Sequence, residues 1–150
     1  MSEQKYPNVI LVVDDDAAVV AALFRVLERE GHTCAGASNL KQAVRTIAQL
    51  GEQLALVITD LSLAGENGMD LVHHLHRREP KLPVIVLTAF GDWGNYADAL
   101  NEGVVAFLSK PTSTQEILGI VRRVFNGDPP GRISGTGAET RGSRGKRGQP

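Results

Sequence analysis

Chemically reactive side chains follow four apolar segments of this sequence, each at the point where the segment ends. The acidic run Asp14-Asp15-Asp16 follows the first segment, and Asp60 ends the second. Thr88 ends the third segment, and Lys110 follows the fourth. Carboxylates that lie close together repel each other unless a cation neutralises them. A hard divalent cation such as Mg²⁺ and an ammonium group would do so, and one carboxylate could then attack a phosphoryl group.

Such chemistry requires a sheet whose strands all end at one edge. The apolar runs at 9–13, 54–59, 84–88 and 104–109 predict strands buried on both faces, and 33–36 predicts a weaker one. Apolar residues at helical spacing predict a helix after each strand, with Asn39 and Ser113 as caps of the second and last helices. Five strand–helix units predict an α/β fold with a parallel sheet and helices on both faces. Ligands of such sheets bind outside the carboxyl ends of the strands.

Composition limits the alternatives. The chain has 150 residues, a formal net charge of −1 and a single cysteine, Cys34. One cysteine excludes an internal disulfide framework and a zinc cluster built on cysteines. No apolar run approaches the roughly 20 residues that span a bilayer, and the first residues lack the apolar stretch of a signal peptide. We therefore expect a cytoplasmic protein without membrane association.

The chain divides near residue 126. Residues 1–126 hold all the predicted strands and helices and form one domain. Residues 127–150 are dominated by Gly, Ser, Arg and Lys, and Ile133 is their only large apolar residue. Such a segment buries too little surface to offset its ordering entropy, so we expect a disordered, basic Gly/Arg-rich tail.

Taken together, the motifs resemble the receiver domain of two-component response regulators over about residues 8–125. The matching segments are Val12-Val13-Asp14-Asp15-Asp16, Ile58-Thr59-Asp60-Leu61-Ser62-Leu63, Gly65-Glu66-Asn67-Gly68, Val86-Leu87-Thr88-Ala89 and Phe107-Leu108-Ser109-Lys110-Pro111. The resemblance implies a flavodoxin-like three-layer sandwich with five parallel strands in the order 2-1-3-4-5 and five helices.

The resemblance also implies roles for the acidic residues. Asp60 would be the phosphoacceptor and would take a phosphoryl group from a sensor histidine kinase or a histidine phosphotransfer protein. Asp14, Asp15, Asp60 and the backbone carbonyl of Ser62 would hold Mg²⁺. A receiver is not an enzyme that acts on other molecules, because it catalyses only its own phosphorylation and dephosphorylation.

Three further residues would read the phosphorylation state. Thr88 would hydrogen-bond a phosphoryl oxygen, Lys110 would pair with the acceptor, and Phe107 would be the aromatic switch that turns inward. The bond before Pro111 is expected to be cis. The positions expected to tune phosphoryl lifetime are Ser62 and Phe90.

The space after residue 126 is too short for an output domain. We therefore expect a stand-alone receiver with no DNA-binding domain, which signals to a downstream protein through its fourth helix, fifth strand and fifth helix. Whether it forms a homodimer is left open.

Two other functions remain open at this stage. A haloacid-dehalogenase-like Mg²⁺-dependent phosphatase would use Asp14 as its nucleophile, but Ala18 departs from the Asp-x-Asp-x-Thr/Val signature of that class. A receiver-like binding module that is never phosphorylated is the other. The neighbouring His73 and His76 suggest a metal pair, but with no third ligand evident a solvated helix face is the better interpretation.

Overall fold

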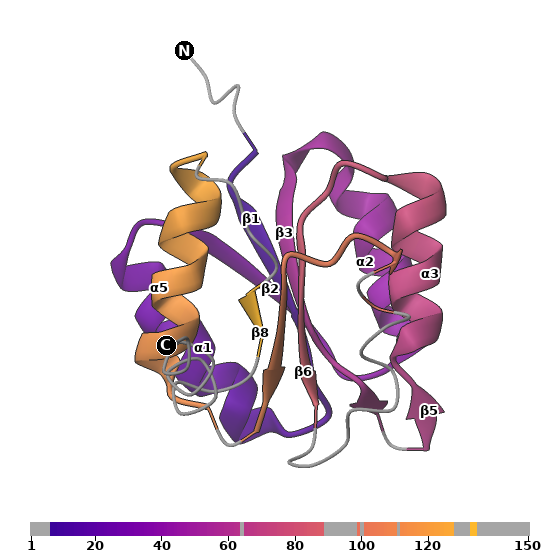
Figure 1. Ribbon diagram of the computed structural model, residues 1–150, viewed down its shortest axis with the longest axis horizontal. Coiled ribbons are helices and arrows are strands. Elements are labelled where there is room, and N and C mark those ends of the chain that lie inside the picture. The colour runs from indigo at the N-terminus through magenta and orange to yellow at the C-terminus, as the bar shows by residue number, and fades with distance from the viewer. Residues whose placement is uncertain are drawn as a thin grey trace, which may run out of the picture.

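The computed structural model of this chain describes residues 7–63, 65–88, 99, 101–110, 112–127 and 133–134. A parallel sheet forms the middle layer of a three-layer sandwich (Figure 1). Helices α1 (Ala17–Arg29) and α5 (Thr114–Phe125) cover one face of the sheet, and α2 (Leu40–Leu50) and α3 (Met69–Arg78) cover the other. A short 3₁₀ helix, η1 (Gly51–Gln53), follows α2.

The sheet has the predicted order. Its strands β1 (Val9–Val13), β2 (Thr33–Ala37), β3 (Leu54–Asp60), β6 (Val84–Thr88) and β7 (Ala106–Ser109) lie in the order β2-β1-β3-β6-β7, all parallel. This arrangement corresponds to 2-1-3-4-5 and confirms the predicted flavodoxin-like fold. It also brings the carboxyl ends of β1, β3, β6 and β7 to one edge of the sheet (Figure 1).

Three short strands were not predicted. Strand β8 (Ile133–Ser134) adds to the outer edge of β7 in parallel, within the segment expected to be a disordered tail. Residues 128–132 and 135–150 lie outside the described part of the chain, so the disordered tail stays a prediction. Strands β4 (Ser62–Leu63) and β5 (Glu66–Asn67) form a small antiparallel pair where the sequence indicated only a loop.

Helices α2 and α5 begin at the caps that the sequence indicated. Asn39 Oδ1 accepts a hydrogen bond from the Gln42 N–H at 2.8 Å, and Ser113 Oγ accepts one from the Glu116 N–H at 3.0 Å. Asp16 caps α1 by accepting from the Ala18 N–H at 3.0 Å. Each cap satisfies a donor that the first turn of a helix leaves without a partner.

The predicted fourth helix lies largely outside the described residues. Of the predicted segment 95–102, residues 99, 101 and 102 are described: the first two are helical, and residue 102 lies in a turn.

The core consists of two layers, one on each face of the sheet. Leu11, Val57 and Val86 point toward α2 and α3, and their neighbours Ile10 and Ile58 point toward α1 and α5. All five are fully buried. Strands covered on both faces are continuously apolar, and each such side chain contributes about 1.5–3 kcal/mol of burial free energy. This rigid sheet fixes the positions of the polar residues at its carboxyl end.

Candidate functional site

Three carboxylates meet at the carboxyl end of the sheet. Asp14 and Asp15 directly follow β1, and Asp60 is the last residue of the neighbouring strand β3. One carboxylate oxygen from each lies within 4.8 Å of the others. Asp14 and Asp60 are buried and Asp15 is exposed, so the cluster opens to solvent on one side. The sheet thus brings together the acidic residues that the sequence predicted.

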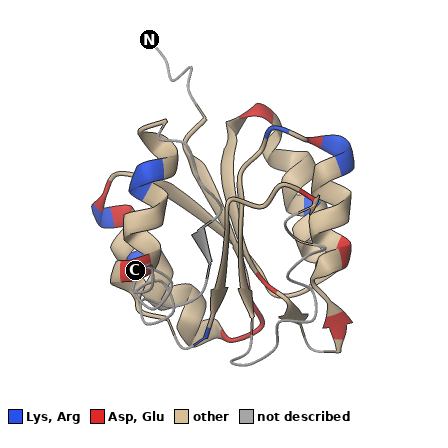
Figure 2. Ribbon diagram, viewed as in Figure 1, with Lys and Arg blue, Asp and Glu red and all other residues tan. Residues whose placement is uncertain are grey.

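Lys110 supplies a cation to this cluster. Its Nζ lies 3.1 Å from Asp60 Oδ2 and 3.2 Å from Asp14 Oδ2, so one ammonium group bridges two strand ends. Acidic and basic segments lie side by side at the lower end of the sheet in Figure 2. One cation against three carboxylates leaves an excess of negative charge.

Burial shifts the protonation equilibria of this pair. Burial raises the pKa of Asp60, and the hydrogen bonds from Lys110 and from the Ser62 N–H only partly oppose it. Burial by itself would lower the pKa of Lys110, but the hydrogen bond and charge of Asp60, with those of Asp14, outweigh it and raise that pKa. Lys110 is therefore held in its charged form beside Asp60.

The backbone around Asp60 is fixed from three directions. The Leu61 N–H donates to the Leu87 carbonyl at 2.9 Å, which ties the end of β3 to β6. Thr59 Oγ1 donates to the Asp60 carbonyl at 3.0 Å, and the Ser62 N–H approaches Asp60 Oδ1 at 3.3 Å. Asp60 is therefore presented on a rigid backbone, as a reacting group requires.

Gly68 is a site-shaping residue that sequence reasoning quoted in a motif but gave no role. Its N–H donates to the Leu61 carbonyl at 2.7 Å. A Cβ built at this position would lie 2.4 Å from the Asp60 carbonyl oxygen and 2.7 Å from Leu61 Cα. Both are backbone atoms that cannot turn away, so only glycine lets the start of α3 pack against the backbone of Asp60 and Leu61.

The predicted switch residues lie on the two adjacent strands. Thr88 is fully buried at the end of β6, one residue beyond Leu87, which is in register with Asp60. Phe107 is fully buried in β7 and belongs to the core cluster on the α2–α3 face. The ring thus points inward in this structure. Ser109, which received no predicted role, ends β7 in register with Thr88.

Several predicted details are not tested by the described residues. Phe90 and Pro111 lie outside them, so the lifetime and cis-peptide expectations stay predictions. Ser62 is exposed at the start of β4, and its backbone carbonyl remains a predicted metal ligand.

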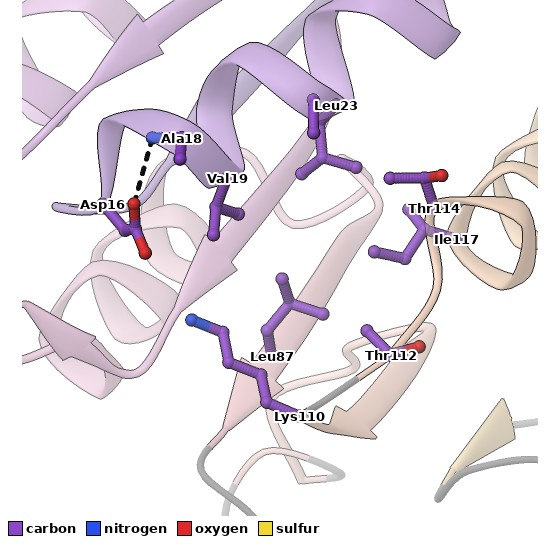
Figure 3. A pocket seen from close by; sticks show the side chains of 10 residues that line it. Asp16, Ala18, Val19, Leu23, Leu87, Lys110, Thr112, Thr114 and Ile117 are labelled. Atoms are coloured by element: carbon purple, nitrogen blue, oxygen red, sulfur yellow. Dashed lines mark hydrogen bonds between the residues drawn. The ribbon is translucent and has the colours of Figure 1, made fainter.

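An apolar cavity of about 680 Å³ lies beside Lys110, between the start of α1, β6 and the start of α5. Figure 3 shows Leu87 and Ile117 facing this cavity, with the Lys110 side chain along one side. Asp14 and Asp15 line a second cavity, of about 450 Å³, between α1 and β2. The acidic cluster is therefore flanked by open space on both sides of α1.

The histidines of α3 have acidic contacts instead of a metal site. His73 Nδ1 lies 2.7 Å from Glu102 Oε2, and His76 Nδ1 lies 3.8 Å from Glu102 Oε1. Among the described residues, the three aspartates are the only group of three potential ligands that converge closely enough to hold an ion.

The donor set fits Mg²⁺. All three converging groups are carboxylates, and Mg²⁺ binds oxygen ligands, commonly one or two carboxylates with phosphate oxygens and water completing its shell. Lys110 reaches the inner side of the cluster, while exposed Asp15 leaves the outer side open to a hydrated ion.

Within the described part of the chain, no helix is long and apolar enough to cross a bilayer. The cytoplasmic location stays a prediction.

Solved structures of response regulators resemble this chain. The chain superposes on a response regulator receiver domain protein from Clostridium thermocellum with a TM-score of 0.73 and 28% identity, over 79% of this chain and 94% of that one. It also matches a response regulator from Burkholderia pseudomallei that carries a phosphorylated aspartic acid, a calcium ion and citrate. That match has a TM-score of 0.67 and 28% identity, over 75% of this chain and 65% of that one.

The prediction of a stand-alone receiver with no DNA-binding domain is contradicted by its relatives. The DNA-binding transcriptional regulator NtrC of Azospirillum brasilense is 33% identical over 121 residues, which are 81% of this chain and 25% of that protein. The chain spans about a quarter of the length of the first relatives it matches. In them the matching segment is one part of a longer regulator. The small number of residues after residue 126 is a poor basis for that prediction, because it does not show whether a receiver domain is part of a longer protein.

The family follows from the order of these motifs along the whole fold. The family model of the response regulator receiver domain matches residues 10–122, from β1 to the last turns of α5. This chain therefore belongs to the response regulator receiver domain family.

Proposed function

We propose that the chain accepts a phosphoryl group on Asp60 from a phosphohistidine donor, in a Mg²⁺-dependent reaction, and changes conformation in response. The observation that carries this proposal is that Asp14, Asp15 and Lys110 all lie around the buried carboxylate of Asp60. The family membership supports it, and so does the phosphorylated aspartate of the matched Burkholderia structure.

The reaction needs only positioning and charge compensation from this chain. A carboxylate oxygen of Asp60 attacks phosphorus, an O–P bond forms, and the N–P bond to the donor imidazole breaks. Asp14 and Asp15 would hold the Mg²⁺, which would offset charge on the phosphoryl oxygens. Lys110 would do the same from the other side, and Thr88 would donate its hydroxyl to one of these oxygens.

The reverse change restores the carboxylate. Water attacks phosphorus, the O–P bond breaks, and inorganic phosphate leaves. The proposal includes that the chain itself catalyses both its phosphorylation and its dephosphorylation. It also includes that the backbone carbonyl of Ser62 is a ligand of the Mg²⁺. The signal is thus written and erased on one residue, as a two-state switch requires.

The phosphatase alternative is not favoured. It needs Asp14 as nucleophile, yet the residue four positions later is Ala18, where the signature of that class has Thr or Val. It also leaves Asp60 without a role. The match to receiver domains likewise gives no support to a module that is never phosphorylated.

Intact-protein mass after incubation with acetyl phosphate and Mg²⁺ tests the proposal. The wild type should gain one phosphoryl group, and Asp60→Asn should gain none. Chelation of the metal should also prevent the gain. Asp70→Asn is a matched control, because Asp70 is an exposed aspartate on α3 outside the cluster, and this variant should react like the wild type.

Two results would contradict the proposal. A phosphoryl group that persists on Asp60→Asn would move the acceptor elsewhere. Turnover of acetyl phosphate that depends on Asp14 and not on Asp60 would favour the phosphatase.

A further inference from the structure

Ser109 carries a buried hydroxyl that the proposed chemistry does not yet use. The residue ends β7 and is 2% exposed. Within the described residues, its Oγ is the one buried side-chain oxygen or nitrogen without a hydrogen-bond partner. Folded proteins rarely leave such a group unsatisfied, because it loses its water contacts and gains nothing in return. The exception therefore calls for a functional explanation.

The strand geometry places this hydroxyl beside Thr88. Phe107 and Val86 belong to the core cluster on the α2–α3 face, and side chains two residues further along a strand lie on the same face. Ser109 and Thr88 are those residues, and they are in register on adjacent strands. Adjacent strands lie about 4.8 Å apart, so the two hydroxyls can meet by rotation about one side-chain bond.

The backbone holds these two residues in place. The Lys110 N–H donates to the Thr88 carbonyl at 2.7 Å, directly after Ser109. Lys110 itself reaches Asp60 at 3.1 Å on the other side of the strand end. Ser109 therefore adjoins both residues that would contact the phosphoryl group, because it precedes Lys110 in the chain and is in register with Thr88.

We propose that Ser109 is a positioning residue for Thr88, an inference that rests on the proposed function. A threonine hydroxyl has one proton to donate and two lone pairs that accept. When Thr88 donates its proton to a phosphoryl oxygen at Asp60, its own oxygen accepts the hydrogen bond of Ser109. The resulting chain runs from Ser109 to Thr88 to the phosphoryl group, and each bond polarises the next.

In this arrangement the Ser109 hydroxyl shifts the equilibrium between the forms with and without the phosphoryl group. Without the phosphoryl group the hydroxyl is buried and unsatisfied, which destabilises that form. With the phosphoryl group it gains its partner. Removal of the hydroxyl should therefore stabilise the form without the phosphoryl group and destabilise the form that carries it. A purely structural serine would not show this combination.

The experiment compares thermal unfolding with and without beryllofluoride and Mg²⁺, since beryllofluoride on a carboxylate mimics a phosphoryl group. Ser109→Ala should raise the Tm of the free protein by about 3 °C. It should also lower the apparent affinity for beryllofluoride by about 5- to 10-fold, the loss expected for one hydrogen bond. Ser109→Thr keeps the hydroxyl and should restore the affinity.

Thr59→Val is the matched control. Thr59 is a buried threonine on the neighbouring strand β3, and its hydroxyl already donates to the Asp60 carbonyl. Its removal should lower the Tm both with and without beryllofluoride, whereas removal of the Ser109 hydroxyl should not.

Three outcomes would overturn the inference. A lower Tm of free Ser109→Ala would mean that the hydroxyl is already bonded there. An equal rise with and without beryllofluoride would mean that it has no partner in either form. An unchanged affinity for beryllofluoride, in a protein whose wild type gains a phosphoryl group by mass, would remove the role of Ser109 and leave the proposed function intact. If the wild type gained no phosphoryl group, the proposed function itself would be wrong, and so would the role of Ser109 that rests on it.

Discussion

An exposed ion pair and a buried ion-pair cluster each join distant parts of the chain, and the two differ in burial more than in geometry. Arg122 and Glu30 join α5 to the end of α1 by two parallel contacts of 3.0 and 3.1 Å, with side chains 56% and 32% exposed. Lys110 makes single contacts of 3.1 and 3.2 Å to Asp60 and Asp14, whose side chains are 7% and 2% exposed. The Arg122–Glu30 pair, which has the better geometry, is the one that is exposed to solvent.

The difference teaches which pair can do chemistry. Arg122 and Glu30 are balanced in charge, and exposed pairs contribute little to stability. The Lys110 cluster has more carboxylates than cations in a buried site, an arrangement that is costly unless a ligand completes it. The exposed pair has the better hydrogen-bond geometry, whereas the buried cluster has the unbalanced charge, and it is the cluster that we propose to be functional.

The strongest way to break this comparison is to remove the cation from each pair. Lys110→Met should lower the free energy of unfolding by about 2–4 kcal/mol, because it leaves two buried carboxylates without a counter-charge. It should also slow phosphoryl uptake. Arg122→Met should change stability much less, and chemical denaturation of both variants measures the contrast. Equal losses would show that burial does not separate the two pairs.

The next effect concerns the backbone that supports the buried cluster. Gly68→Ala should cost about 2 kcal/mol, because its Cβ would overlap backbone atoms of Asp60 and Leu61. Phosphoryl uptake should fall with it. Gly119→Ala is the control, since nothing lies within 4 Å of a Cβ there and the residue is inside α5. That change should stabilise the protein by up to about 1 kcal/mol. A neutral Gly68→Ala would contradict the close approach.

A smaller effect of opposite sign is expected at the exposed carboxylate of the cluster. Asp15→Asn should raise the free energy of unfolding by about 1 kcal/mol without Mg²⁺, because it relieves repulsion among three neighbouring carboxylates. The same variant should lose most of the stabilisation that Mg²⁺ gives to the wild type. Thermal unfolding across a Mg²⁺ titration shows both. If Mg²⁺ stabilised the variant and the wild type alike, Asp15 would not be a ligand.

The smallest effect should come from the exposed pair. Glu30→Gln should lower the Tm only slightly, and the difference from the wild type should shrink further in high salt. Phosphoryl uptake should not change. A loss as large as that of Lys110→Met would show that this surface pair is a structural contact of the first importance.

Sequence reasoning succeeded where the location of a residue in the fold follows from its place at a strand end. Continuous apolar runs fixed the strands, and parallel order then required Asp14, Asp60 and Lys110 to meet. Helix caps at Asn39 and Ser113 were visible because a cap depends on local sequence alone.

It failed where the answer depends on contacts between distant residues. The two-residue strands β4, β5 and β8 are too short to show a period. The restriction at Gly68 and the missing partner of the Ser109 hydroxyl exist only once the neighbouring strands are in place. The interpretation of His73 as a solvated residue missed Glu102, which lies 29 positions later in the chain.

The ion pairs of Lys110 also set an order of events as the chain is synthesised. Asp14 and Asp60 belong to neighbouring strands and leave the ribosome early, whereas Lys110 follows Asp60 by 50 positions and Asp14 by 96. At the usual 5–20 residues per second, the two acids therefore wait for roughly 3–10 seconds for their protein counter-ion. During that interval a dissolved divalent cation can offset the repulsion between them. Cellular Mg²⁺ would then act first as an aid to folding and only later in signalling.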